Sequence, residues 1–320
     1  MNTFNAYTHT LRQGIIAFTA TILFAINPVH AAGKAQQSFN SPEEAADALV
    51  VAVTKGDKND LLGVLGKQGE KLINSGDAVA DKLGREKFIA KYQEAHKIVN
   101  QDDTKAMLYI GEDEWPFLIP IVKQESSWKF DAQEGEQEFL NRRIGKNELD
   151  TIQAVLAFAD AQREYYLEDR DGDGVLEYAT KFRSSKGKKD GLYWPTKEGE
   201  QESPLGPLVA GARTEGYTVK KGEKTPYHGY YYKILNGQGE GASGGAYSYM
   251  AKGQMIGGFA LIAFPARYGV SGVKSFLINH EGVVYETDMG PNTSRIAEKM
   301  TRFNPDSNTQ MVDSVSTEAP

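Results

Sequence analysis

Three aspartates at alternate positions give the clearest indication of chemistry in this chain. Asp169, Asp171 and Asp173 are followed by Gly174, a residue that can turn sharply. The pattern matches positions 1, 3, 5 and 6 of an EF-hand calcium loop, with a backbone carbonyl and a glutamate at later ligand positions. The sequence therefore predicts a structural calcium site whose ligands are Asp169, Asp171, Asp173, Val175 and Glu177.

The match to the EF-hand covers only the front half of that loop. Position 12 is Thr180, where an EF-hand carries a bidentate glutamate. A shorter calcium site closed by Glu177 or Asp160 is one interpretation. The other is a polar turn that ends a helix, because Asp and Gly are ordinary turn formers.

A second motif is the glycine-rich stretch 241–245, which fits the G-x-S-x-G string of serine hydrolases around Ser243. That chemistry needs a strand before the serine and a helix after it, whereas both neighbours read as strand or loop. The later His280 and Asp288 follow in the reverse of the hydrolase order. We interpret the stretch as a glycine loop and expect no enzyme. An envelope polymer hydrolase using Ser243 is the alternative.

The remaining residues indicate no other cofactor. His96, His228 and His280 are isolated in the sequence, and a zinc site needs three or four converging ligands. No phosphate-binding glycine loop is followed by Lys-Ser/Thr. With 36 Lys+Arg, 43 Asp+Glu and a net charge of −7, the chain suits neither nucleic acid nor an anionic membrane as partner. The expected partner is an envelope protein or polysaccharide.

The elements that must position the acidic loop follow from hydrophobic periodicity. A helix is expected from Asn147, as N-cap, to about Glu168, with a domain boundary near Gly145 just before it. Upstream, a capping box at 41–44 predicts a first helix that ends at Gly56. Further helices are expected over Lys58–Leu65 and Arg85–Ile98.

Alternating apolar residues predict strands in both halves of the chain. In the first half these are Lys105–Ile110, Trp115–Lys123 and Ser127–Asp131. In the second half they are Gly229–Leu235, Ala246–Ala251, Gly258–Phe264, Val273–Asn279 and Val283–Asp288. The last two are expected to form a hairpin in which Gly282 takes a positive φ.

The N-terminus has the features of a secretory signal peptide. Arg12 precedes the apolar run 14–26, and Val29-His30-Ala31 suits signal peptidase, so cleavage is expected after Ala31 or Ala32. The mature chain should then be periplasmic or secreted, soluble, and not inserted in a membrane. It contains 0 cysteines, so packing alone must stabilise it.

These patterns predict an α+β protein of two domains. The expected divisions are a signal peptide over 1–31, a flexible leader over 32–40, an α+β domain over 41–140, a second over 141–302 and a disordered tail over 303–320.

Element order resembles two known folds. Residues 41–131, helices followed by a curved antiparallel sheet with a Trp-Lys-Phe-Asp strand, resemble the cone of nuclear-transport-factor-2-like domains. The helix at 147–162, the Asp171-Gly172-Asp173-Gly174 loop and the strands around 264–283 look like the head domain of type IV pilins and pseudopilins. The apolar N-terminal run is separated from that helix by a whole domain, so a pilus subunit is not expected.

Several longer motifs resemble a family of exported bacterial proteins of unknown function over about residues 41–303. They are Asn141-Arg142-Arg143-Ile144-Gly145, Asp190-Gly191-Leu192-Tyr193-Trp194-Pro195, Ser203-Pro204-Leu205-Gly206-Pro207-Leu208 and Gly244-Gly245-Ala246-Tyr247. The resemblance implies no activity and no catalytic residues. The sequence thus predicts an exported, non-catalytic binding or scaffolding module.

Overall fold

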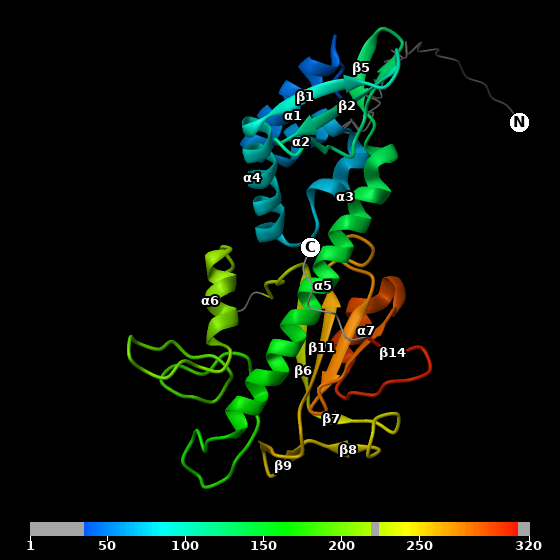
Figure 1. Ribbon diagram of the computed structural model, residues 1–320. Coiled ribbons are helices and arrows are strands. Elements are labelled where there is room, and N and C mark those ends of the chain that lie inside the picture. Colours follow the sequence, from blue (N-terminus) through cyan, green and yellow to red (C-terminus); the bar gives the residue numbers. More distant parts are fainter. Residues whose placement is uncertain (1–34, 219–223, 313–320) are drawn as a thin grey trace, which may run out of the picture. The chain divides into compact units, whose positions relative to one another are not determined.

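The computed structural model describes residues 35–218 and 224–312, and within them the chain is α+β with antiparallel sheets (Figure 1). The predicted signal peptide, residues 1–31, lies outside the described residues. The helices are α1 (Pro42–Lys55), α2 (Lys58–Leu65), η1 (Lys67–Gly69), α3 (Glu70–Ile73), α4 (Ala78–Glu94), α5 (Ala132–Tyr166), α6 (Gly206–Thr214), η2 (Gly290–Asn292) and α7 (Thr293–Lys299).

The first sheet has the order β1-β2-β4-β5, with β3 also pairing with β2. Its strands are β1 (His96–Asn100), β2 (Lys105–Ile110), β3 (Trp115–Pro116), β4 (Ile121–Gln124) and β5 (Ser127–Phe130). Helices α1, α2 and α4 pack against it, and their apolar faces form one hydrophobic core within residues 39–132.

The second sheet has the order β14-β13-β12-β11-β6. Its strands are β6 (Tyr230–Leu235), β11 (Ala260–Pro265), β12 (Ser275–Asn279), β13 (Val284–Thr287) and β14 (Gln310–Met311). Between β6 and β11 lie the short strands β7 (Gly237–Gln238), β8 (Tyr247–Ser248), β9 (Met250–Ala251) and β10 (Gln254–Met255). Helix α5 packs on β12 and also contacts β11 and β13, and a second core forms within residues 152–303.

Local signals specify several elements as expected. Ser41 caps α1 by accepting from the Glu44 N–H, and Gly56 ends the helix with φ +68°. The Glu44 carboxylate reaches back to the Asn40 N–H at 2.8 Å, one residue before the N-cap whose N–H a capping box would use. The β12–β13 hairpin is confirmed, and Gly282 in its turn has φ +84°.

The expected start of the long helix at Asn147 is wrong. Helix α5 begins at Ala132, and the Asp131 side chain caps it by accepting from two backbone N–H groups. Glycine is required at position 135, because a Cβ there would lie 2.3 Å from the Leu118 carbonyl oxygen. The expected boundary near Gly145 therefore lies inside a continuous helix, although the two cores fall on either side of it.

Other boundaries also differ from the sequence expectation. The helix expected over Arg85–Ile98 is α4, which begins at Ala78 and ends at Glu94. Ile98 lies in strand β1. The predicted strand Trp115–Lys123 is divided into β3 and β4, consistent with prolines at positions 116 and 120, which cannot donate to a sheet ladder.

The segments expected to be flexible are packed where the structure describes them. In the leader, Phe39 is buried and its backbone exchanges hydrogen bonds with Trp128. In the tail, Phe303 is 1% exposed against Tyr285, and β14 pairs with β13. In both segments an isolated aromatic residue supplies the anchor, and an isolated residue leaves no periodic pattern in the sequence.

Polar contacts join the two cores at the start of α4. The Asp77 carboxylate is buried, and it accepts from the Tyr217 hydroxyl at 3.0 Å and from the Gly229 N–H at 2.9 Å. Arg143 of α5 donates to the carbonyls of Lys71 and Leu72. These contacts hold segments that are more than seventy residues apart in the chain.

Candidate metal centre

The acidic loop begins where α5 ends at Tyr166. The Leu167 N–H bonds to the Glu164 carbonyl, and the chain then turns through residues 168–174. It leaves the turn as an extended segment in which the Tyr178 N–H donates to the Met255 carbonyl of β10 at 2.8 Å. The loop thus connects the C-terminus of α5 to the β9–β10 ribbon.

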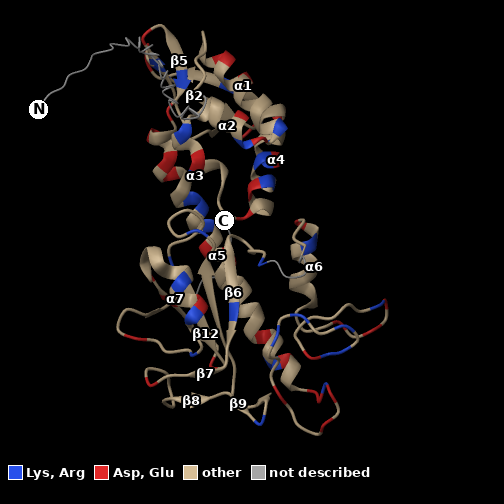
Figure 2. Ribbon diagram, turned by 180° about the vertical axis from the view of Figure 1, so that it is seen from behind, with Lys and Arg blue, Asp and Glu red and all other residues tan. Residues whose placement is uncertain are grey.

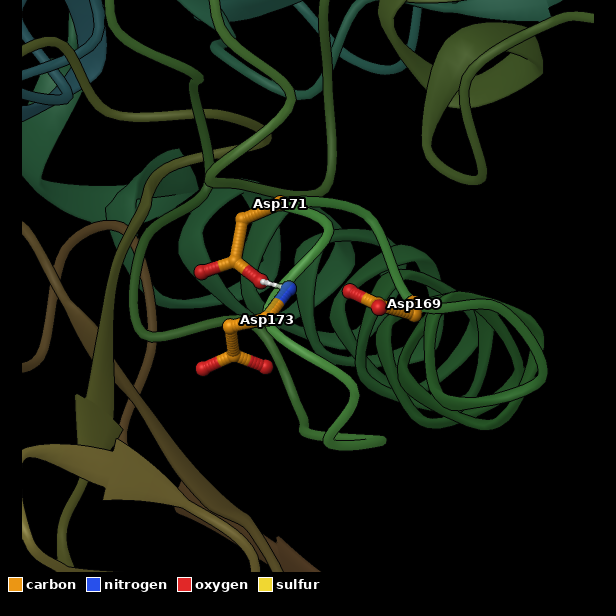
Figure 3. A group of neighbouring side chains, drawn as sticks. All are labelled: Asp169, Asp171 and Asp173. Atoms are coloured by element: carbon orange, nitrogen blue, oxygen red, sulfur yellow. Dashed lines mark hydrogen bonds between the residues drawn. The ribbon is translucent and has the colours of Figure 1, made fainter.

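The structure brings the three predicted aspartates together. One carboxylate oxygen from each of Asp169, Asp171 and Asp173 lies within 4.8 Å of the others, and all three side chains are exposed (Figure 3). No other group of three or more His, Cys, Asp or Glu residues converges in this way within the described residues. Carboxylate oxygens at this spacing are the ligands that calcium prefers.

Backbone N–H groups shape the loop around Asp169. Its two oxygens accept from Gly172 at 2.7 Å and from Gly174 at 2.8 Å. These bonds, the one from Gly174 first, hold the pKa of the Asp169 carboxyl below its ordinary value. Gly174 has φ +85°, and a Cβ there would meet no atom within 4 Å, so glycine is needed for its backbone angle rather than for space.

The predicted later ligands are placed less directly. Val175 donates its N–H to the Asp173 carboxylate at 2.9 Å. Glu177 is not part of the converging group, but burial, followed by the charges of Asp171 and Asp173, raises its pKa. Asp160 pairs with Arg163 at 3.0 Å and is also outside the group. Of the two residues considered as the closing ligand, Glu177 is the one whose pKa is raised by the charges of the aspartates.

Two residues that support the loop were not predicted. Gln254 of β10 donates its side-chain amide to Asp173, which ties the loop to the β9–β10 ribbon. The Arg170 side chain is only 3% exposed; it pairs with Glu168 at 2.9 Å and lies over the rings of Tyr165 and Trp194. In the sequence, a single arginine among aspartates looks like a solvent-exposed charge. No sequence feature therefore indicated that Arg170 is buried.

The glycine-rich stretch around Ser243 does not form a nucleophile elbow. It lies in the connection between β7 and β8, and no helix follows it. The buried Gln238 side chain donates to the Ser243 carbonyl at 2.5 Å and to the Gly245 carbonyl at 2.8 Å. His280 instead packs its ring against Tyr249 and Phe259. The stretch is therefore a loop held by its backbone.

The other histidines are engaged separately. His96 stacks on Tyr92 with ring centroids 3.8 Å apart. His228 has φ +49° and lies between two carboxylates, 3.3 Å from Asp150 and 3.5 Å from Glu215. Figure 2 shows that Lys or Arg and Asp or Glu both occur on α4 and on α7.

The fold and the loop together define an α+β protein with one acidic, glycine-bearing turn at the end of its longest helix. A family model described as "Protein of unknown function (DUF2950)" matches residues 36–312, so the chain belongs to this family. No curated protein and no solved structure matches the chain. Among residues 35–218 and 224–312, no helix is both long and apolar enough to cross a membrane.

Proposed function

We propose that this protein is an exported, non-catalytic binding or scaffolding module of the bacterial envelope, and that the loop 169–177 holds a structural calcium ion. The observation that carries the calcium proposal is the convergence of three carboxylates within 4.8 Å at a turn with two positive-φ glycines, Gly172 and Gly174. Asp169, Asp171 and Asp173 would supply carboxylate oxygens, Val175 its carbonyl, and Glu177 the closing carboxylate.

Electrostatics gives the ion a structural role. Without a cation, the aspartates repel one another and also Glu177, whose pKa they raise in addition to the effect of burial. A bound ion would remove this repulsion and fix the exit of α5 against β10, which Gln254 and Tyr178 already contact. Calcium is therefore expected to stabilise the fold rather than to drive a reaction.

The missing twelfth-position glutamate sets the expected affinity. Sites with fewer carboxylates, as in extracellular modules, have dissociation constants of about 0.1–1 mM. At 10 mM calcium such a site would stabilise the folded state by about 1.4–2.7 kcal/mol through mass action. For a protein of this size that corresponds to a rise in melting temperature of several degrees.

The test is thermal unfolding in chelator and in 10 mM calcium. Asp171→Asn and Asp173→Asn should each abolish the calcium-dependent rise. Asp102→Asn is the matched control, because Asp102 is also an exposed turn aspartate that accepts from a nearby backbone N–H. Equal melting temperatures with and without calcium would reduce the loop to a turn.

Export is proposed from the N-terminal sequence, with cleavage after Ala31 or Ala32. Sequencing the N-terminus of the protein from an envelope fraction tests it, and an intact Met1 would contradict it.

The likeness of the first half to nuclear-transport-factor-2-like cones, and of the second to pilin heads, is proposed on element order. A helix followed by a sheet of order β14-β13-β12-β11-β6 is compatible with the second likeness.

A further inference from the structure

A polar cleft lies beside the first turns of α5, distant in sequence from the acidic loop. It has a volume of 610 Å³, and its walls come from η1, α3, the start of α5 and the β11–β12 connection. Every side chain that lines it is charged or carries an amide. Small-molecule pockets are usually lined mainly by apolar groups. Side chains that all end in a charged or amide group suit a hydrophilic ligand.

The charges in the cleft do not cancel. Its two acids are already paired, Glu136 with Lys71 and Glu70 with Lys58. The bond from Lys58 is the main reason that the pKa of Glu70 lies below its ordinary value. These pairs leave the cleft walls with no carboxylate that lacks a cation.

Two cations in the cleft have no carboxylate partner within the described part of the chain. Lys67 is exposed and forms no ion pair with residues 35–218 or 224–312. Arg267 donates to the Asn74 carbonyl but to no acid, so most of its guanidinium N–H groups remain available. The two side chains line the same cleft from η1 and from the β11–β12 connection, which places two cations that form no ion pair among the described residues around one space. With Lys71 they outnumber the two acids of the lining by one positive charge.

Hydrogen-bonding groups accompany these charges. The side-chain amides of Gln68 and Gln133 line the cleft and have no intramolecular hydrogen-bond partner among the residues that the structure describes. An amide donates through nitrogen and accepts through oxygen, so the cleft can bond to hydroxyl, amide and acid groups of one ligand. No aromatic ring lines it, so stacking on a sugar ring or a base would not contribute.

We propose that this cleft binds a small hydrophilic anion through its carboxylate or phosphate oxygens, with Lys67 and Arg267 supplying the charge and the glutamines completing the hydrogen bonds. Arginine forms bidentate bonds with either group. This inference extends the binding role proposed above by giving it a place and a ligand class. Because Arg267 belongs to the second half of the chain and the other walls to the first half and α5, the ligand would also bridge the two cores.

The test is calorimetric titration of the purified protein with citrate, with inorganic phosphate and with neutral glucose. The buffer contains no calcium, because citrate and phosphate bind that ion, so failure here leaves the calcium proposal unaffected. Saturable binding of citrate or phosphate, with no binding of glucose, is expected. The stronger of the two anions identifies carboxylate or phosphate as the preferred group.

Variants then locate the site. Lys67→Gln should weaken binding by about fivefold, the effect of losing one exposed ion pair of good geometry. Its melting temperature should not change, because Lys67 makes no ion pair with any residue that the structure describes, and Lys67→Arg should retain binding. Lys188→Gln is the matched control: Lys188 is exposed and also unpaired within the described residues, but it lies in the turn before Tyr193. Absence of saturable anion binding, or equal weakening by both lysine variants, would overturn the proposal.

Discussion

Two glycine-rich loops in this chain resemble reaction or ligand motifs, and the structure uses them in different ways. In the loop 169–174, backbone N–H groups bond to an aspartate side chain, and three carboxylates remain exposed on one side of the turn. In the loop 239–245, a buried glutamine bonds to backbone carbonyls, and the side chain of Ser243 bonds to none of the residues that the structure describes. A short motif becomes a candidate site only where its side-chain atoms converge.

The two loops also differ in whether neighbouring segments approach their glycines closely. In the acidic loop, Gly172 and Gly174 have positive φ and open space around them. In the other loop, a Cβ on Gly239 would lie 2.3 Å from the Asn304 side chain, and one on Gly241 would lie 2.1 Å from the Pro305 carbonyl. Gly239 and Gly241 therefore make the second loop a docking point for the C-terminal segment, while its Gly244 and Gly245 have positive φ, as in the acidic loop.

The largest effect is expected from filling this docking point. Gly241→Ala should destabilise the protein by about 1–3 kcal/mol, the usual cost of forcing an extra methyl group against neighbouring atoms, here the Pro305 backbone. Ser243→Ala should change stability by less than about 0.5 kcal/mol, as for other exposed positions. Denaturant-induced unfolding measures both. If Ser243→Ala were the more damaging change, or if reactive serine probes labelled Ser243, the docking interpretation would fail.

Features that depend on residues close together in the sequence were predicted, and features that depend on residues distant in the sequence were not. The Ser41 cap of α1, the β12–β13 hairpin and the convergence of the three aspartates follow from residues within a few positions of one another, and all were predicted. The true start of α5 was missed. Gly135 lies near that start, and the contact that requires a glycine there comes from the backbone of Leu118, in a different segment. The packing of Phe303 and the burial of Arg170 likewise depend on distant partners.

A smaller effect should distinguish glycine used for its backbone angle from glycine used for close approach. Gly174→Ala places a side chain at φ +85°, where a left-handed conformation costs about 1–2 kcal/mol. It should also weaken any calcium-dependent rise in melting temperature. Gly145→Ala is the matched control, because Gly145 lies inside α5 with no atom within 4 Å of its Cβ position.

The control should change stability in the opposite direction. Alanine is about 1 kcal/mol more favourable than glycine inside a helix, so Gly145→Ala should raise the free energy of unfolding. Chemical denaturation of both variants in chelator separates backbone strain from metal binding. Equal effects of the two substitutions would show that the acidic turn does not depend on a positive φ.

The smallest effect concerns the charge of Glu177. Its pKa is raised in the folded protein, first by burial and then by Asp171 and Asp173. A carboxyl whose pKa is raised in the folded state binds its proton more tightly there than in the unfolded state. Its ionised form therefore destabilises the folded protein above that pKa. This destabilisation disappears as the pH falls through the folded-state pKa. Without calcium, Glu177→Gln should therefore raise the melting temperature at pH 7 and leave it unchanged at about pH 3, where Glu177 is protonated in both states.

The rise at pH 7 should not exceed the roughly 2–4 °C that 1 kcal/mol produces in a protein of this size. With calcium present, Glu177→Gln should instead lower the melting temperature at pH 7. The variant lacks the carboxylate ligand that the ionised Glu177 would provide in the wild-type protein. Glu281→Gln, an exposed acid in the β12–β13 turn that is not part of the converging aspartate group, should show neither effect. A Glu177→Gln variant whose melting temperature is insensitive to both pH and calcium would remove Glu177 from the site and leave the three aspartates to bind the ion alone.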